Sequence, residues 1–330
     1  NVDDMLNGVR IELEEGKKDP IDFALWKSAK PGEIYWESPW GKGRPGWHIE
    51  CSVMALDTLG QTIDIHGGGR DLLFPHHENE IAQSEALTGK KFANIWSHCG
   101  LIKINGEKMS KSLGNSLTIR DALKKYDYET IKYVMFSKHY GSDVDLSYND
   151  YSLAENHLNY FYTSIKEMNK YIKDNLVKEY DVKDDIADSI IPKFVENMDE
   201  DFNTTASIAN LYNIFKYANN IMKTSKDKTK EDIANILRKI LKNVHEVYSV
   251  LGLFDQNPDE YITKLKNKYL KELDIDEENI KQEIEKRAKA KQNKDFEKAD
   301  KIRNALEAKG IILKDSKEGT SWDFKSLYNG

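Results

Sequence analysis

The segment Gly106–Asn115 carries the clearest chemistry in the chain. Two lysines, Lys108 and Lys111, flank a serine, and glycines stand near both ends. Glycines let a backbone approach a ligand closely, and lysines supply mobile point charges that suit phosphate oxygens. Cations placed in advance stabilise the negative charge that builds on a reacting phosphorus and a departing pyrophosphate. The spacing therefore predicts that this segment, which we call the lysine-serine loop, binds the phosphates of a nucleotide.

A second group of residues could hold a metal ion. His76 and Glu80 are four residues apart, so they lie on one helical face if Pro75 opens a helix. Cys51 adds a thiolate, and thiolate, imidazole and carboxylate are all zinc ligands. On composition alone, other side chains of these types are equally available: His48, His77 and Glu78.

A basic segment lies near the C-terminus of an acidic chain. The whole chain has a net charge of −7, yet residues 284–303 carry eight basic and four acidic side chains. A solvated helix face and a phosphate-binding surface both account for such a run. Phe296 could stack on an unpaired base, but its helical spacing with Ala299, Ile302 and Leu306 also allows a place in the core.

Length and composition exclude several classes of protein. The chain has 330 residues, of which 39% are apolar and 10% aromatic, so it can form cores and is not disordered. No apolar run approaches the roughly 18 to 20 residues that span a bilayer, so we expect no membrane partner. Two cysteines cannot form a disulfide framework, which favours a cytoplasmic protein.

Three zones of different pattern follow one another. Residues 1 to about 150 predict a mixed α/β region, and the next zone, to residue 252, has the apolar spacing of helices that bury their faces on one another. In the first zone we expect strands at 61–65 and 95–104 and helices at 77–87 and 118–125.

The last zone should be a linker followed by a small module. Residues 253–277 are acidic, contain Pro258 and predict an irregular segment. The elements expected after it are two helices, at 278–291 and 295–309, and a hairpin that pairs 311–313 with 320–324.

Three strings, in this order and at this spacing, resemble the cysteinyl-tRNA synthetases, a family of class I aminoacyl-tRNA synthetases: WHIEC, DIHGGGRDLLFPHHENEIAQSEA and GEKMSKSLGN. The resemblance is strong over residues 20–150 and continues weakly to the C-terminus. It implies the C-terminal half of a Rossmann-like catalytic domain, then an α-helical bundle and a small α+β anticodon-binding module. The domains expected are 1–97 with the zinc site, 98–150 with the lysine-serine loop, 151–262 and 263–330.

The resemblance also implies an activity and its residues. The family ligates L-cysteine to its tRNA with ATP and Mg²⁺ through a cysteinyl-adenylate. The loop that closes over ATP matches Lys108, Met109, Ser110, Lys111 and Ser112, with Lys111 as the main contact and Lys108 assisting. The ligands of one Zn²⁺, which binds the substrate thiolate, match Cys51, His76 and Glu80. Pocket residues match Trp47 and His66.

The C-terminal module resembles the part of the family that reads the anticodon. The positions that match anticodon contacts are Lys291, Phe296, Asp300, Arg303 and Asp315. Acidic groups can accept hydrogen bonds from base amino groups, while lysines hold phosphates. The family often has arginine where this chain has Lys291. A cysteine-specific tRNA is thus the expected macromolecular partner, and a monomer is the expected assembly.

The family also carries a His-x-Gly-His signature and a further zinc-binding cysteine early in its fold, and this sequence has neither. We therefore expect a parent protein that is longer by about one and a half hundred residues, roughly half a nucleotide-binding domain. We also expect that this stretch alone does not complete the reaction. Two alternatives are a mycothiol-type ligase that passes cysteine to an amino sugar, which the basic terminal module disfavours, and a truncated paralogue that only binds tRNA or zinc.

Overall fold

The computed structural model describes residues 18–19, 21–104, 106–109, 117–224, 227–316 and 319–325. The chain divides into two compact units, which are described separately. The first comprises Asn1–Lys103 and Tyr140–Val144, and the second comprises Ile104–His139 and Asp145–Gly330. Within the described ranges, no helix is both long and apolar enough to cross a membrane.

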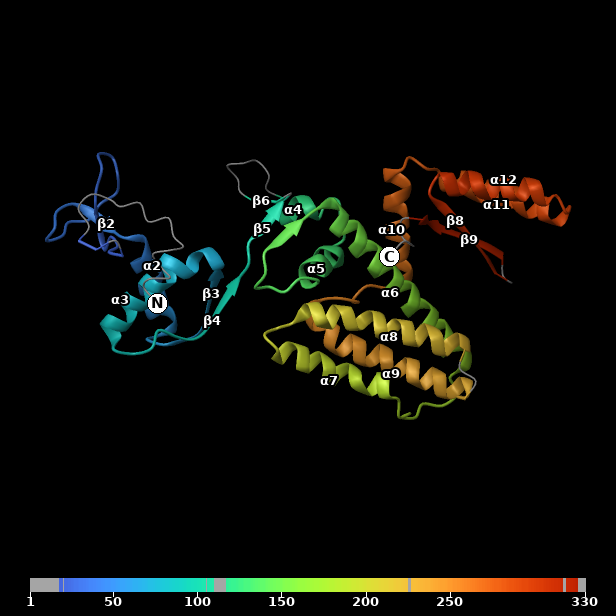
Figure 1. Ribbon diagram of the computed structural model, residues 1–330, viewed down its shortest axis with the longest axis horizontal. Coiled ribbons are helices and arrows are strands. Elements are labelled where there is room, and N and C mark those ends of the chain that lie inside the picture. The colour runs from blue at the N-terminus through green and yellow to red at the C-terminus, as the bar shows by residue number, and fades with distance from the viewer. Residues whose placement is uncertain are drawn as a thin grey trace. The chain divides into compact units, whose positions relative to one another are not determined.

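A parallel βαβ unit forms the centre of the first unit (Figure 1). Strand β3 (Ile63–Gly69) pairs in parallel with β4 (Ala93–Cys99), and helix α3 (Glu78–Thr88) lies between them in the chain. The register pairs Gly69 with Cys99. Because the strands are parallel, their carboxyl ends lie at one edge, where ligands bind in open α/β sheets.

Helix α2 (Trp47–Leu59) packs against α3 in the first unit. A short antiparallel pair, β1 (Trp26–Ser28) with β2 (Gly43–Pro45), precedes it. The small core beneath the parallel strands consists of Ile63, Phe92 and Ala93, packed by Ala55, Ile81 and Trp96. The predicted α/β character of this region is confirmed.

The strand predicted over 95–104 is interrupted in the structure. After β4, the backbone N–H of Gly100 donates to the carbonyl of Tyr140, and the chain resumes pairing only in β5 (Ile102–Ile104). A Cβ at Gly100 would lie 2.0 Å from the carbonyl oxygen of Ser142. This close approach of two backbone segments, which local sequence does not reveal, explains why one continuous strand was the wrong expectation.

Strand β5 is the middle strand of a three-stranded sheet. Its neighbours are β6 (Glu107–Lys108) and β7 (Val144–Leu146). The N–H of Gly106 donates to Asp145 Oδ1 at 3.0 Å, and Gly106 has a φ of 81°, which glycine adopts without strain. Asp145 of β7 therefore holds the turn that leads into the lysine-serine loop.

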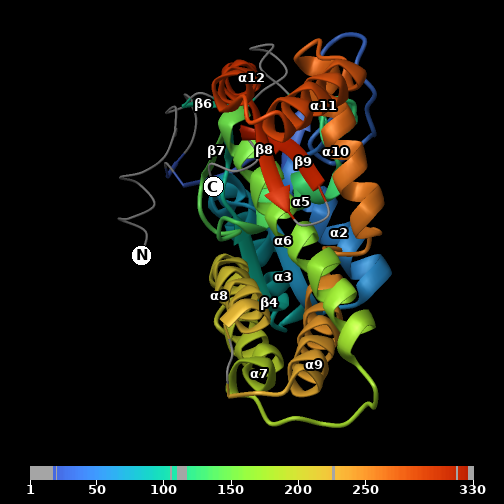
Figure 2. The same cartoon turned by 90° about the vertical axis from the view of Figure 1, so that its right-hand side faces the viewer.

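Four long helices build the body of the second unit, and they pack on one another (Figures 1 and 2). They are α6 (Tyr148–Asn175), α7 (Asp185–Asp199), α8 (Thr204–Thr224) and α9 (Lys230–Tyr248). Apolar residues at the predicted helical spacing are fully buried, among them Leu158, Phe161, Leu211, Phe215 and Ile240. The predicted helical bundle is confirmed.

Two shorter helices precede the bundle. The helix predicted over 118–125 is only one turn, α4 (Ile119–Ala122), whose first turn is capped by the Thr118 side chain. Helix α5 (Tyr128–Phe136) follows, and the Asp127 carboxylate caps it by accepting a hydrogen bond from the N–H of Glu129. The break between α4 and α5 allows both helices to begin with a cap.

Residues 253–277, predicted to be irregular, contain the helix α10 (Pro258–Glu272), so that prediction was wrong. Asn257 caps its first turn, and proline in that turn is favourable because the N–H it lacks would have no helical partner. Side chains four residues apart bury one face of α10, which packs against α6: Tyr261, Leu265 and Tyr269.

The C-terminal elements agree closely with their prediction. Helices α11 (Glu277–Gln292) and α12 (Phe296–Ala308) pack against each other, and α12 packs against the strand that follows. Strand β8 (Ile311–Ser316) pairs antiparallel with β9 (Gly319–Phe324). Gly310, with a φ of 79°, separates the last helix from the hairpin. The domain boundaries stated above stay predictions.

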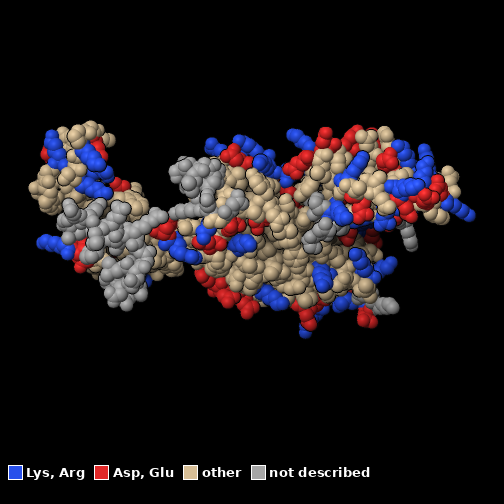
Figure 3. All heavy atoms as spheres, turned by 45° about the horizontal axis from the view of Figure 1, so that its top comes forward, with Lys and Arg blue, Asp and Glu red and all other residues tan. Residues whose placement is uncertain are grey.

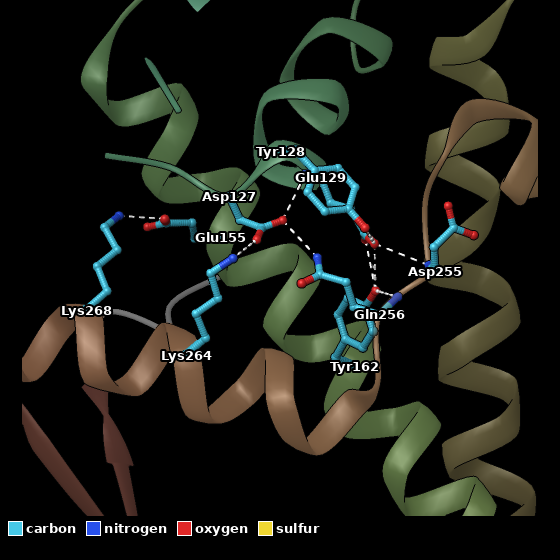
Figure 4. A network of polar contacts seen from close by, with 9 residues as sticks. All are labelled: Asp127, Tyr128, Glu129, Glu155, Tyr162, Asp255, Gln256, Lys264 and Lys268. Carbon is cyan, nitrogen blue, oxygen red and sulfur yellow. Dashed lines mark hydrogen bonds and ion pairs between the residues drawn. The ribbon is translucent and has the colours of Figure 1, made fainter. Parts of the chain in front are cut away.

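A buried carboxylate ties α5 to α6 and to the segment after α9 (Figure 4). Glu129 is fully buried, and both of its oxygens accept from the Tyr162 hydroxyl at 2.9 Å. The backbone N–H groups of Phe254 and Asp255 also donate to it, at 3.1 and 3.2 Å. Burial raises the pKa of Glu129, although these donors oppose that shift. The carboxylate thus organises three segments at once.

Replacing Glu129 with alanine should lower the free energy of unfolding by about 3 kcal/mol, because one hydroxyl and two backbone donors lose their acceptor inside the core. Glu246→Ala, at an exposed position on α9, is the matched control and should change stability by less than about 0.5 kcal/mol. Urea denaturation followed by circular dichroism measures both. Equal losses for the two variants would contradict this role of Glu129.

Candidate active site

Glu80 lies at the centre of a polar cluster in the βαβ unit. Its side chain belongs to α3 and is fully buried. Oε1 lies 2.9 Å from His76 Nε2, and Oε2 lies 2.7 Å from His66 Nε2 in a hydrogen bond. Each carboxylate oxygen thus faces one imidazole, and the two imidazoles come from different elements of the unit.

Cys51 completes a possible metal site with His76 and Glu80. One ligand atom from each residue lies within 4.8 Å of the other two. Cys51 comes from α2, and His76 comes from the helical turn η2 (Leu73–His77) that leads into α3. The structure therefore brings together the three residues that the sequence analysis selected.

The Oε1 atom of Glu80 supports a cation between these side chains. It is buried, it lies 2.9 Å from His76 Nε2, and no described residue donates a hydrogen bond to it. A buried acceptor without a partner is costly and rare in native proteins. A divalent ion shared by the two atoms would satisfy it. One sulfur, one nitrogen and one oxygen donor form a set that suits Zn²⁺.

Further side chains hold the imidazole of His76 in place. His48 Nδ1 lies 2.8 Å from His76 Nδ1, on the ring edge away from Glu80. The Trp47 ring stacks on His76 with a centroid distance of 4.3 Å. Partners of this kind fix the tautomer and orientation of a histidine ligand. Both predicted pocket residues touch the cluster, Trp47 through His76 and His66 through Glu80.

A second histidine group adjoins the first and was missed by the sequence analysis. Ligand atoms of His66, His77 and Glu80 also lie within 4.8 Å of one another. His77 Nδ1 in turn lies 2.8 Å from His98 Nε2. Burial is the main reason why the pKa of His77 is lowered to about 4. Only the register of β3 against β4, which places Gly68 opposite His98, could have revealed this neighbour.

Burial, followed by the charge of Glu80, raises the pKa of the Cys51 thiol. Both causes disfavour the thiolate when no cation is nearby. A bound metal ion reverses this preference, because it stabilises the deprotonated sulfur directly. The electrostatics of the cluster are thus those of a site in which a bound cation would favour the thiolate of Cys51.

Comparison with known proteins agrees with this geometry. The family model "tRNA synthetases class I (C) catalytic domain" matches residues 1–156, and a DALR domain model matches residues 193–255. A cysteine–tRNA ligase of Geotalea uraniireducens is 43% identical over 98% of this chain and 68% of its own length. This chain belongs to the cysteine–tRNA ligase family. A relative from Thermodesulfovibrio yellowstonii is 45% identical over 98% of this chain and 66% of its own.

The family membership confirms the predicted fold class, a class I catalytic domain followed by helical domains. The match to a solved methionyl-tRNA synthetase of Mycobacterium tuberculosis, in complex with methionyl-adenylate, covers 61% of this chain and 46% of the solved chain. Its TM-score is 0.42 at 16% identity, a likeness too weak to carry an argument.

The lysine-serine loop of this cysteine–tRNA ligase family member is described only at its start. Lys108 ends strand β6, and Met109 follows it. Ser110, Lys111 and Ser112 lie outside the described residues. Their predicted contacts with ATP stay predictions.

The predicted anticodon residues fall into two groups. Lys291 Nζ and Asp315 Oδ2 lie 2.8 Å apart, whereas Asp300 and Arg303 are exposed along α12. Phe296 is the first residue of α12 and is 63% exposed, so the alternative that placed it in the core is wrong. The helical spacing suggested a core position, but the first residue of this helix extends beyond the packed face.

Gly68→Ala should disturb the histidine cluster, since the added Cβ would lie 2.7 Å from Cε1 of His77. The ring of His77 is buried and is hydrogen-bonded to His98, so it has little room to move. We expect a loss of about 1 to 3 kcal/mol in stability from this overpacking. Gly67→Ala is the matched control, because its Cβ would lie 3.4 Å from its nearest neighbour, the Ser97 carbonyl oxygen. Thermal unfolding measures the stability of both variants. A Gly68→Ala protein as stable as the Gly67→Ala control would contradict the packing described.

Proposed function

We propose that the natural protein ligates L-cysteine to its tRNA with ATP, through a cysteinyl-adenylate. Membership in the cysteine–tRNA ligase family supports this reaction. The observation that carries the proposal is the convergence of Cys51, His76 and Glu80 within 4.8 Å of one another, from α2, η2 and α3. We also propose that it acts as a monomer in the cytoplasm.

Cys51, His76 and Glu80 would hold one Zn²⁺. The ion, when bound, supplies a ligand position for the thiolate of the substrate cysteine, and zinc accepts sulfur more readily than the hydroxyl of serine. The protein's own part is to keep the ligands oriented. His48 and Trp47 fix the ring of His76, while His66 binds the second oxygen of Glu80. Selectivity would then come from the type of donor atom more than from the size of the pocket.

The lysine-serine loop would bind ATP with its Mg²⁺. Lys108 and Lys111 would hold phosphate oxygens while the carboxylate of cysteine attacks the α-phosphorus and pyrophosphate leaves. Positive charges placed in advance lower the barrier because negative charge accumulates on those oxygens. The basic C-terminal module would bind the tRNA, and this favours tRNA over an amino sugar as acceptor.

Cysteine-dependent exchange between ATP and pyrophosphate, followed by transfer to tRNA, tests the proposed reaction. The natural protein should catalyse the exchange and charge a cysteine-specific tRNA but not an amino sugar. An amino sugar that accepts the cysteine would instead identify the mycothiol-type ligase. Absence of exchange in the natural protein would leave the paralogue that only binds tRNA or zinc.

Replacing Cys51 with serine should lower zinc affinity by at least about 100-fold, because a ligand is lost and not merely reoriented. Competition with a chromophoric chelator measures that affinity, and a thiolate-to-cobalt absorption band in the Co²⁺-loaded protein reports the sulfur directly. Cys99→Ser is the control, since Cys99 is an exposed free thiol. Equal zinc affinity in the two variants would remove Cys51 from the site.

A further inference from the structure

The carboxylate of Asp315, near the end of β8, receives four donors. Arg287 binds it with both terminal nitrogens, NH1 to Oδ1 at 2.8 Å and NH2 to Oδ2 at 2.9 Å. The Thr320 hydroxyl donates to Oδ1 at 2.7 Å, and the Lys291 ammonium donates to Oδ2 at 2.8 Å. An ionised carboxylate has about four acceptor positions, so all of them are used.

The donors differ in their access to solvent. The Arg287 side chain is 4% exposed, whereas those of Asp315 and Lys291 are 45% and 40% exposed. Arg287 and Lys291 are four residues apart on α11, so both face the hairpin from one side of that helix. The guanidinium therefore approaches Asp315 from inside the module, and the ammonium approaches it from the surface.

A planar, two-pronged contact fixes orientation in a way that a single ammonium cannot. The two parallel hydrogen bonds from the Arg287 fork fix the plane of the carboxylate. The partner strand adds the Thr320 hydroxyl, which lies opposite Asp315 in the register. Arg287 chiefly holds the pKa of Asp315 well below its usual range, with Lys291 and Thr320 adding to the effect. The carboxylate at the surface is thus held in one orientation by the guanidinium behind it.

Charge alone does not make this surface selective. Acidic and basic side chains are interspersed where the C-terminal helices lie, at the right-hand end of the view in Figure 3. Mixed signs give weak general attraction for phosphates, whereas oriented donors and acceptors distinguish base edges. An exposed pair that is held rigidly from behind is therefore the feature of this module best suited to discrimination between bases.

We propose that Arg287 is a positioning residue for RNA recognition, because it holds Asp315, and through Asp315 the Lys291 ammonium, whose two other donors meet the bases of a bound loop. This inference rests on the proposed tRNA function. Arg287 itself does not touch the RNA, since it is buried. It acts on specificity, whereas the exposed lysines of the module act on affinity.

The test measures binding of stem–loop RNAs to the natural protein by fluorescence anisotropy. One RNA carries the cysteine anticodon, and three others each have one of its bases replaced. Arg287→Lys keeps the charge but removes the fork, so the ratio of Kd values between replaced and cognate loops should fall by about tenfold for at least one base. Thr320→Val, which removes one donor and leaves Arg287 in place, should lower the same ratio by a smaller factor.

Lys281→Ala is the control, because this exposed lysine pairs with Glu277 within α11 and is not among the described residues that contact Asp315. Its ratio should stay unchanged. Ratios unaltered within twofold in both Arg287→Lys and Thr320→Val would overturn the inference while leaving the tRNA function intact. Failure of the unsubstituted protein to bind any of the four RNAs would overturn the tRNA function, and this inference with it. If Arg287→Lys does not fold, as judged by circular dichroism, the Thr320→Val ratio decides alone.

Discussion

The fully buried carboxylate of Glu80 places the strongest constraint on the first unit. A charge removed from water must be compensated by partners at close range, or it destabilises the fold. Here His66 compensates one oxygen, while the other faces His76 without a hydrogen bond. The Cys51 sulfur lies within 4.8 Å of the ligand atoms of Glu80 and His76. A cation is the one partner that would satisfy all three groups at once, and the proposed selection of a thiol follows from its preference for sulfur.

The parallel strands explain why these groups can meet. Glycines follow His66 along β3, so the imidazole of His77 can lie directly over the backbone of Gly68. The register also pairs Gly68 with His98 of β4, whose Nε2 lies 2.8 Å from His77 Nδ1. A side chain in place of Gly68 would occupy the space that the ring needs. The site therefore requires a glycine at position 68 as well as the ligands themselves.

In the second unit, two further buried ionisable groups each gather several partners. Glu129 gathers donors from Tyr162 and from the segment after α9, and Arg287 directs its whole fork at Asp315. In each case a buried ionisable group organises segments that are distant in sequence. A buried group that makes several hydrogen bonds favours one arrangement, because any alternative would break those bonds inside the fold. This gives the module that carries Lys291 a rigid base.

Local pattern was enough to predict some elements but not others. Local sequence predicted α11, α12 and the final hairpin, and an i, i+4 pair predicted that His76 and Glu80 would meet. The break after β4 depends on Ser142, and the contact between His77 and His98 depends on strand register, so neither is local. Pro258 was misread as a breaker because its value depends on its place in the first helical turn.

X-ray absorption at the zinc K-edge, on the natural protein with and without added L-cysteine, tests the central claim most directly. The account predicts one additional sulfur neighbour at about 2.3 Å when cysteine is added, and none when L-serine is added instead. An unchanged sulfur count on addition of cysteine, or a purified protein that binds no zinc, would contradict it.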